Sequence, residues 1–329
     1  MSTKTNFLAL SKPAAGDEDW TAEINANWDA ISALSAPTNC FFVSPAFTES
    51  ALGNSSAADR RHFPKIQEAL DEIEVVGSNE QTTVFVYPGD YYESLSLASS
   101  VAIVSYFGIN RMYGAGSVRI RGNNSASPVI RVQPPSGTAK RYSFFGIGFE
   151  NQYNASDAVQ HDCYLLSAER QVTIGSYPST IDFRDCTVRA QTWGAHNAWT
   201  SMFDLDGYYL IRVKNCRFGA LNYAGGYNDG GIGCFFRMRG WSYAAPVKAC
   251  SAQIEDSIFY NASTISAYTR RIFDLNEETN GWFYRCASND QRAFCYSAAG
   301  LGENLISGIE SDGAAATYRN DFSLSIGGF

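Results

Sequence analysis

Apolar and polar positions alternate in a series of short segments along most of this chain. The clearest copies are IDFRDCTVRA at 181–190, IRVKNCRFGA at 211–220 and AQIEDSIFYN at 252–261. Aligned on Asp185, Asn215 and Asp256, they run apolar, polar, apolar, polar, Asp or Asn, then Cys or Ser. Alternation of this kind predicts strands with one buried face. Similar strands that recur along the chain predict a repeat architecture.

Further copies extend the series in both directions. SFFGIGFEN at 143–151 is a looser copy, and WFYRCAS at 282–288 places Cys286 where Cys186 and Cys216 stand. A second, weaker series runs between the copies, with SMFDLD from 201, GCFFRM from 233 and RIFDLN from 271. Each period of about 30 to 40 residues therefore contains two or three short strands joined by loops of variable length.

Repeating strands of this kind stack equivalent positions from one coil to the next. We expect an inward ladder of Cys186, Cys216 and Cys286, flanked by apolar ladders such as Phe183, Val213 and Ile254. The Asp or Asn beside each Cys is expected at a turn, because these residues tolerate left-handed backbone. The period is too irregular for a propeller, and crossover helices for a (β/α) barrel are absent. The pattern predicts a mainly β fold, a right-handed parallel β-helix.

One helix is predicted in front of the strands. In FPKIQEALDEIEVV, Phe63, Ile66, Leu70 and Ile73 share one helical face, and Pro64 suits the first turn. TTVFVYPGDYYESLSL follows and is typical of a strand, a turn at residues 88–90 and another strand. The pattern predicts a helix over 63–76.

These two segments together resemble the opening of proteins with the pectin-lyase-like β-helix. The matching residues are Tyr87, Pro88, Gly89, Tyr92 and Glu93. The resemblance implies that the helix caps the open end of the solenoid and that a V-x-PG-x-Y-x-E hairpin starts the first coil. It implies a fold more than a function.

The first 30 residues follow a different pattern. Trp20, Ile24, Trp28 and Ile31 recur at helical spacing, and Asp19 is well placed to begin that helix. A stripe this short is not stable as a lone helix in water and needs a partner surface. The partner is either the chain's own β-helix, as in plain packing, or another copy or protein.

This segment, LSKPAAGDEDWTAEINANWDAI, resembles the N-terminal segment of bacteriophage tail fibres and spikes. The resemblance rests on a KP-x-x-GD-x-DW string, and the residues it assigns to virion docking are Pro13, Gly16, Asp19, Trp20, Ile24, Asn27 and Trp28. It implies a virion protein, made in the host cytoplasm, that binds other virion proteins of tail or head through its N-terminus. It also implies a homotrimer.

The sequence accordingly divides into four parts. We expect a docking segment at 1–35, a connector at 36–62, the β-helix at 63–295 and a C-terminal closing segment at 296–329. The last part is rich in small residues and ends in DFSLSI, where Phe322, Leu324 and Ile326 share one face. This strand is expected to cover the last edge of the solenoid or to join subunits.

Composition excludes several classes of protein. Hydrophobic residues make up 45% and charged residues 18%, and the net charge is −8 with no basic block. Because the net charge is negative and no basic block is present, we do not expect nucleic acid as a partner. We do not expect membrane insertion either, since no apolar run approaches roughly 18 residues. The segment after Met1 lacks the pattern of an export signal. The eight cysteines and three histidines show no metal-ligand spacing, so we expect free buried thiols, no metal and no cofactor.

Catalysis on a β-helix would need a pair of carboxylates. The candidates are Asp204 and Asp206, on one face of a strand, and Asp274, with Arg237 and Arg239 between. The alternative is a set of cross-strand ion pairs on a solvent face. No VDFIFG-like strand of the pectin methylesterase type and no hydrolase-type NTD…DD…GH series is present. The sequence favours a non-enzymatic role; the alternative is a tailspike depolymerase, either a polysaccharide lyase or a glycoside hydrolase.

Binding has better sequence support. The longer loops hold aromatic residues beside Asn, Asp and Ser, and we predict glycan or receptor contacts at Trp193, Trp199, Tyr223, Tyr227 and Trp241. Flat aromatic rings suit both the apolar faces of sugars and protein interfaces. The alternative is that they pack within or between subunits. The sequence thus predicts a virion fibre or spike that binds a host glycan or receptor. A cellular polysaccharide enzyme is a third interpretation, against which the missing export signal counts.

Overall fold

The computed structural model describes just over half of the chain. The described residues are 3–4, 11–12, 40–47, 61–76, 81–106, 117–122, 128–135, 137–154, 163–171, 178–193, 201–222, 234–239, 250–261, 271–276, 279–288, 295–297, 306–307, 309–311 and 318–320. The chain divides into two units, Met1–Cys40 and Phe41–Phe329. In the first, β1 (Thr3–Lys4) pairs antiparallel with β2 (Ser11–Lys12). Among the described residues, no helix is long and apolar enough to cross a membrane.

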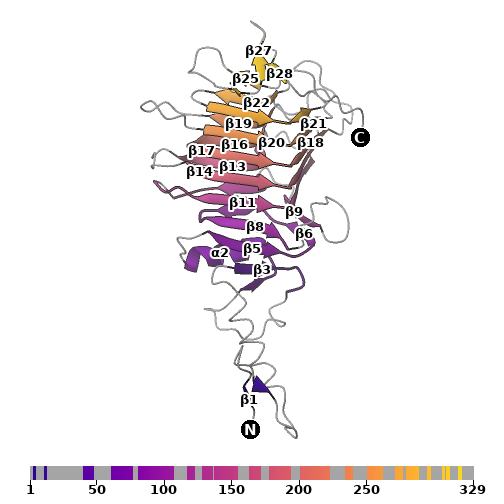
Figure 1. Cartoon of the computed structure of the whole chain (residues 1–329). Helices are drawn as coiled ribbons and strands as arrows, with labels where there is room; N and C mark the ends of the chain where they lie inside the picture. The colour runs from indigo at the N-terminus through magenta and orange to yellow at the C-terminus, as the bar shows by residue number, and fades with distance from the viewer. Residues whose placement is uncertain are drawn as a thin grey trace. The chain divides into compact units, whose positions relative to one another are not determined.

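The second unit is built from three parallel sheets, which Figure 1 shows as successive strands stacked in chain order. The first sheet contains β3 (Cys40–Val43), β4 (His62–Phe63), β5 (Thr82–Val86), β8 (Val101–Ser105), β11 (Arg141–Phe145), β14 (Ser179–Arg184), β17 (Tyr209–Lys214), β20 (Cys250–Glu255), β23 (Thr279–Tyr284) and β26 (Ile306–Ser307). The second contains β7 (Leu95–Leu97), β10 (Ile130–Val132), β13 (Cys163–Gln171), β16 (Ser201–Gly207), β19 (Cys234–Arg239), β22 (Arg271–Asn276) and β25 (Cys295–Ser297). The third contains β6 (Gly89–Tyr92), β9 (Val118–Arg121), β12 (Gly148–Asn154), β15 (Thr187–Trp193), β18 (Arg217–Asn222), β21 (Ile258–Asn261) and β24 (Ala287–Ser288).

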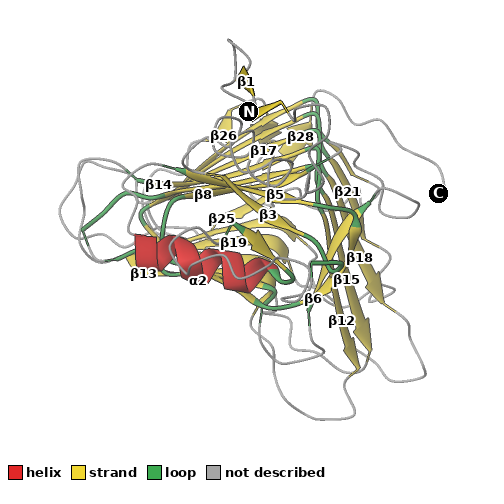
Figure 2. Ribbon diagram, turned by 90° about the horizontal axis from the view of Figure 1, so that it is seen from below, coloured by secondary structure: helices red, strands yellow, loops and turns green. Residues whose placement is uncertain are grey.

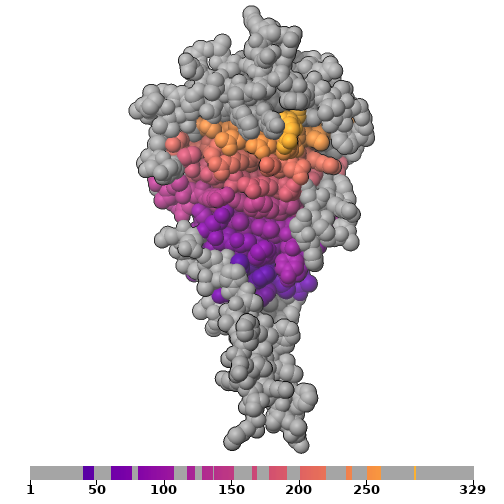
Figure 3. Space-filling view, in the orientation of Figure 1, coloured from indigo at the N-terminus to yellow at the C-terminus, as the bar shows by residue number. Residues whose placement is uncertain are grey.

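From β5 onward, every third strand along the chain pairs with its predecessor in parallel. The chain therefore visits the first, third and second sheets in turn, and each coil adds one strand to each. The space-filling view shows the same progression as bands of colour in chain order (Figure 3). The fold is a right-handed parallel β-helix, as the sequence predicted, with three strands in a coil.

The core consists of side chains that point inward from all three sheets and stack between coils. In the first sheet, Phe183 lies in register with Val213, and Val213 with Ile254, which confirms the predicted apolar ladder. The rings of Phe218 and Phe259 stack with their centroids 4.9 Å apart. Both are almost fully buried. Alternation brings these rings inward because side chains along a strand point to opposite faces.

Helix α2 (Ile66–Val76) covers one end of the solenoid and contacts β4, β5 and β7 (Figure 2). Its start differs from the predicted one, because Phe63 belongs to β4 and pairs with Val43. The helix begins where its first amide groups find an acceptor. The backbone N–H groups of Ile66 and Gln67 donate to the two carboxylate oxygens of Glu93, at 3.0 and 2.8 Å. A carboxylate at this place satisfies amides that have no partner within the helix.

The V-x-PG-x-Y-x-E segment is not a hairpin, and this expectation was wrong. Strands β5 and β6 flank the turn at Pro88 but lie in different sheets, where they pair with β8 and β9 respectively. The segment turns a corner of the first coil. A side chain at Gly89 would place its Cβ 3.0 Å from Pro45 Cγ, so this close approach requires glycine.

Two further regions add strands at the ends of the series. The stretch expected as a connector contributes β3, whose Val43 carbonyl accepts a hydrogen bond from the Tyr87 amide at 2.8 Å. Near the C-terminus, β27 (Ile309–Ser311) pairs antiparallel with β28 (Tyr318–Asn320). The segment DFSLSI lies outside the described residues, and the four domain boundaries stay predictions.

Candidate binding surfaces

The turn between the first and third sheets repeats from coil to coil, and we call it the corner ladder. Asp185, Asn215, Asp256 and Arg285 adopt left-handed backbone there with φ between 51° and 53°, and Gly146 precedes them with φ 66°. The amide groups of the ladder continue the backbone bonding between coils, as Asp185 N donates to the Lys214 carbonyl at 3.1 Å. Asp and Asn were predicted at this turn because they tolerate this conformation.

The residue after each turn points into the core. Cys186 N donates to the Cys216 thiol sulfur at 3.4 Å, and Cys216 N donates to the Ser257 hydroxyl at 3.2 Å. Burial raises the pKa of the Cys216 thiol well above its ordinary value, and the neighbouring Cys186 raises it further. The Cys216 thiol is therefore a neutral packing group rather than a nucleophile. Cys40, Cys186, Cys216, Cys250 and Cys286 are buried and carry thiols rather than disulfides.

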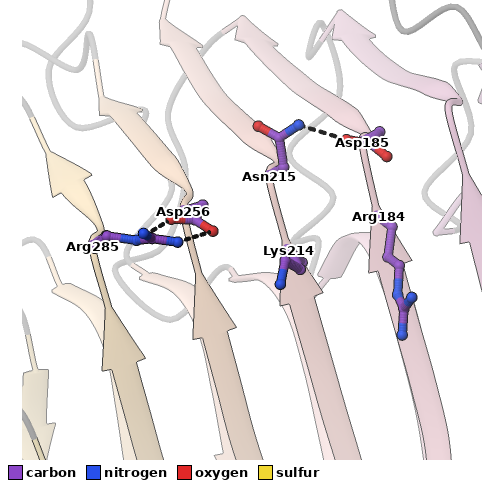
Figure 4. A pocket seen from close by; sticks show the side chains of 6 residues that line it. All are labelled: Arg184, Asp185, Lys214, Asn215, Asp256 and Arg285. Carbon is purple, nitrogen blue, oxygen red and sulfur yellow. Dashed lines mark hydrogen bonds and ion pairs between the residues drawn. The ribbon is translucent and has the colours of Figure 1, made fainter.

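Outside this turn lies an open groove of about 630 Å³, lined by Arg184, Asp185, Lys214, Asn215, Asp256 and Arg285 (Figure 4). Its side chains are largely engaged with one another. Asn215 Nδ2 donates to Asp185 Oδ1, and Arg285 Nη2 donates to Asp256 Oδ2 at 2.8 Å. Lys214 pairs with Glu255 at 3.1 Å. The described lining of the groove offers polar contacts to a ligand and includes no histidine or thiol.

The predicted catalytic residues lie on the second sheet. Phe203 and Leu205 of β16 are fully buried in the core, so Asp204 and Asp206 point to the outer face. The register places Asp204 opposite Arg237 of β19, and Arg237 opposite Asp274 of β22. We call these three positions the second-sheet row. The side chain of Asp274 lies outside the described residues.

Asp204 forms an ion pair within this row. Its Oδ2 lies 3.8 Å from Arg237 Nη1, and both residues are buried, with 7% and 8% exposed. Arg237 Nη2 is buried and has no hydrogen-bond partner among the described residues. A carboxylate held by an arginine is the cross-strand arrangement that the sequence left open as an alternative to catalysis. Among the described residues, no group of three His, Cys, Asp or Glu side chains could hold a metal ion.

The other predicted site residues are not tested by this geometry. The docking residues from Pro13 to Trp28 lie outside the described residues, as do Trp199, Tyr223, Tyr227 and Trp241. Trp193 is the last residue of β15, and its backbone lies in register with Asn154, but its side chain is outside the described part of the chain. The assignment of these residues to docking and to glycan contacts stays a prediction.

Sequence reasoning missed a charged row on the outer face of the third sheet, which we call the third-sheet row. Arg121, Glu150 and Arg189 stand in register on β9, β12 and β15. Arg121 Nη2 lies 2.8 Å from Glu150 Oε2, and Arg189 Nη1 lies 3.8 Å from Glu150 Oε1. Burial lowers the pKa of Arg121, but its hydrogen bond to Tyr92 and the charge of Glu150 outweigh burial and raise it. Alternating polar residues in VRIR, GFEN and TVRA were the available signal.

Comparisons with known proteins found similarity only among solved structures. No family model matches the chain, and no curated protein matches it either. Among solved structures, two crystal structures of pectin methylesterase from Aspergillus niger are similar, one of the deglycosylated and one of the penultimately deglycosylated form. Each has 13% sequence identity and a TM-score of 0.31, over 82% of this chain and 93% of that chain. The described chain is a right-handed parallel β-helix, and its function has to be argued from its own residues.

Proposed function

We propose that this chain is a structural protein of a bacteriophage particle, a tail fibre or spike. In this proposal the N-terminal segment docks to other virion proteins and the β-helix presents its outer faces to a glycan or receptor on the host. The observation that carries the proposal is the order of the two parts, a KP-x-x-GD-x-DW segment followed by a parallel β-helix. The resemblance of the first part to fibre and spike proteins supplies the virion role, and it also supplies the homotrimer.

The outer faces of the solenoid support a role in binding rather than in cleavage. A solenoid offers long surfaces on which equivalent side chains repeat from coil to coil. In its described part the buried outward carboxylates are engaged, Asp204 with Arg237, Glu150 with Arg121 and Asp182 with Arg141. Paired carboxylates of this kind hold neighbouring coils together. A glycosidase would need two carboxyl groups free to act on one bond.

The direct test is the amount of this polypeptide in purified particles. We expect mass spectrometry to find it at a copy number that is a multiple of three and at the level of tail components. A number in proportion to the capsid protein would move it to the head surface. Absence from particles would overturn the virion role.

One observation favours a second function, a depolymerase. Asp204 and Asp206 lie on the same outer face of β16, and Asp274 occupies the same row two coils later along the sheet. If this face is catalytic, Asp204→Asn abolishes cleavage of capsule or exopolysaccharide while the protein stays folded. Cleavage retained by the folded variant would refute the assignment of Asp204 to catalysis.

A further inference from the structure

The open groove outside the corner ladder, which we call the corner groove, belongs to none of the sites predicted from the sequence. Its volume is about 630 Å³, and it is lined by Arg184, Asp185, Lys214, Asn215, Asp256 and Arg285. These residues lie in the turns after β14, β17, β20 and β23 or at the last position of the strand, and the four strands are neighbours in the first sheet. The groove therefore crosses several coils, and its shape suits an extended ligand.

Two of the three cations in the corner groove already have a carboxylate. Arg285 contacts the Asp256 carboxylate through both Nε and Nη2. Lys214 Nζ lies 3.1 Å from Glu255 Oε2 on the neighbouring strand. Neither Arg285 nor Lys214 is therefore the group that an anionic ligand meets without a counter-charge.

Arg184 is the third cation, and it is exposed. Among the described residues its guanidinium contacts only the ring of Phe145, which it covers at 5.6 Å from the centroid. Figure 4 shows its side chain extending along β14, away from Asp185. Lys214 stands directly opposite Arg184 on the next strand, and like charges at opposite positions repel each other. A bound anion offsets that repulsion, and the contact with Phe145 holds the guanidinium in place before the anion arrives.

The corner groove also offers an acceptor for hydroxyl groups. Asn215 Nδ2 donates to Asp185 Oδ1, and this bond fixes the carboxylate. The second oxygen, Oδ2, accepts no hydrogen bond in the described part of the chain, and Asp185 is exposed. A ligand carboxylate accepts from Arg184 and a ligand hydroxyl donates to Asp185, so one groove satisfies both groups. Carboxylates and hydroxyl groups occur together in acidic sugars.

We propose that the corner groove binds an acidic polysaccharide. Arg184 donates to a carboxylate of the glycan, and Asp185 Oδ2 accepts from one of its hydroxyl groups. The Asp185 carboxylate repels a ligand that carries only negative charges, and the net charge of −8 further disfavours a dense polyanion such as nucleic acid. The inference rests on the proposed glycan-binding function and names its ligand class and the face that binds it.

The test is calorimetric binding of alginate oligosaccharides to the full-length protein. We expect Arg184→Gln to weaken binding about tenfold, because it removes a charge-assisted hydrogen bond. The variant is expected to fold, since Arg184 is exposed and its guanidinium makes no ion pair in the described part of the chain; thermal unfolding checks this. The matched control is Arg131→Gln, which removes one exposed positive charge from β10 of the second sheet. It should bind like the wild type.

A second variant separates an acidic sugar from a simple anion. Asp185→Asn removes the negative charge of the acceptor but keeps an oxygen for Asn215 and a residue that tolerates left-handed backbone. We expect it to weaken alginate binding about threefold, because a hydroxyl group bonds less strongly to a neutral amide than to a carboxylate. A ligand held by charge alone would bind this variant more tightly than the wild type, since a repelling carboxylate is gone.

Absence of alginate binding would overturn the proposal, as would a loss of affinity in Arg131→Gln equal to that in Arg184→Gln. It is also overturned if Asp185→Asn binds alginate as tightly as the wild type or more tightly, or if carboxyl-reduced alginate or polyphosphate binds as well as alginate. Because purified protein is used, these outcomes are independent of the particle count. A protein that is abundant in virions yet binds no alginate refutes this inference alone, while one that binds alginate but is absent from virions refutes only the virion role.

Discussion

Two outer faces of the same solenoid each have a row of three charged positions in register, and the charges of the two rows are reversed. In the third-sheet row a buried carboxylate, Glu150, stands between two arginines. In the second-sheet row an arginine, Arg237, stands between two aspartate positions, Asp204 and Asp274. Stacked coils make such rows inevitable, because parallel strands bring equivalent positions about 4.8 Å apart. The two rows therefore place opposite charges at their central positions, Glu150 on the third sheet and Arg237 on the second.

Both rows depend on the same aromatic core, and removing a part of that core should have the largest effect. Phe218 contacts the rings of Phe203, Phe236 and Phe259 and is 1% exposed. We expect Phe218→Ala to lower the free energy of unfolding by about 3–5 kcal/mol, through lost burial and a cavity. Chemical denaturation measures it. Val75→Ala, at a position 81% exposed on α2, should change stability little. Equal effects of the two substitutions would contradict a close-packed core.

The next prediction compares the stability lost at the buried carboxylate of the third sheet, Glu150, with that lost at a partly exposed carboxylate, Glu255. Glu150→Gln removes the buried carboxylate that Arg121 and Arg189 share, and we expect the free energy of unfolding to fall by about 3 kcal/mol. The matched control is Glu255→Gln, which breaks the exposed Lys214 pair and should cost less than about 1 kcal/mol. Urea denaturation of both variants checks the order. A smaller loss for Glu150→Gln than for Glu255→Gln would refute the buried triad.

A double-mutant cycle on the second-sheet row should give a smaller energy. Asp204 and Arg237 are buried but 3.8 Å apart, so we expect Asp204→Asn and Arg237→Gln to couple by about 1–2 kcal/mol. Each single substitution also includes the free-energy cost of leaving the other residue buried without its partner. The double-mutant cycle subtracts this cost and isolates the interaction between the two residues. A coupling near zero would mean that the two residues act independently and would leave Asp204 free for another role.

The smallest effect is expected at Glu93, a buried carboxylate that is held by backbone amides rather than by the ion pairs of Glu150. Glu93 accepts two backbone amides at the start of α2, yet burial raises its pKa above the ordinary value of 4.5 despite those hydrogen bonds. A raised pKa in the folded state means that the folded protein binds the proton more tightly than the unfolded chain. The stability from this group is therefore present below pH 4.5 and is lost as the pH rises through the raised pKa.

Thermal unfolding of wild type and Glu93→Gln across this pH range measures that contribution. We expect the advantage of the wild type over the variant to be largest at low pH and to shrink as the pH rises. Asp71→Asn on the exposed side of the same helix serves as the control. An advantage that grows with pH would show that the helix amides outweigh burial.

The inward-facing side chains of this fold could be predicted because they depend on the local alternation of apolar and polar residues along the chain. Alternation decides which side chains point inward, and the repeated Asp or Asn before Cys marks the corner, since few residues tolerate left-handed backbone. The ladders of Phe183, Val213 and Ile254 and of Cys186 and Cys216 followed from that pattern alone. The V-x-PG segment was misread as a hairpin because a strand, a turn and a strand look alike whether the second strand folds back or enters another sheet.

The sequence by itself determined the class of this protein, a repeating β-solenoid with a helix at its start, because burial of every second side chain leaves a local signature. Only the tertiary structure decided which outward residues become neighbours. Glu150 meets Arg121 and Arg189, and Glu93 meets the start of α2, through contacts between segments far apart in sequence. Loops of variable length separate the strands, so spacing along the chain does not reveal the register between coils. Outward positions accept polar residues of either charge, so the local pattern does not indicate which charges will pair once the coils are stacked.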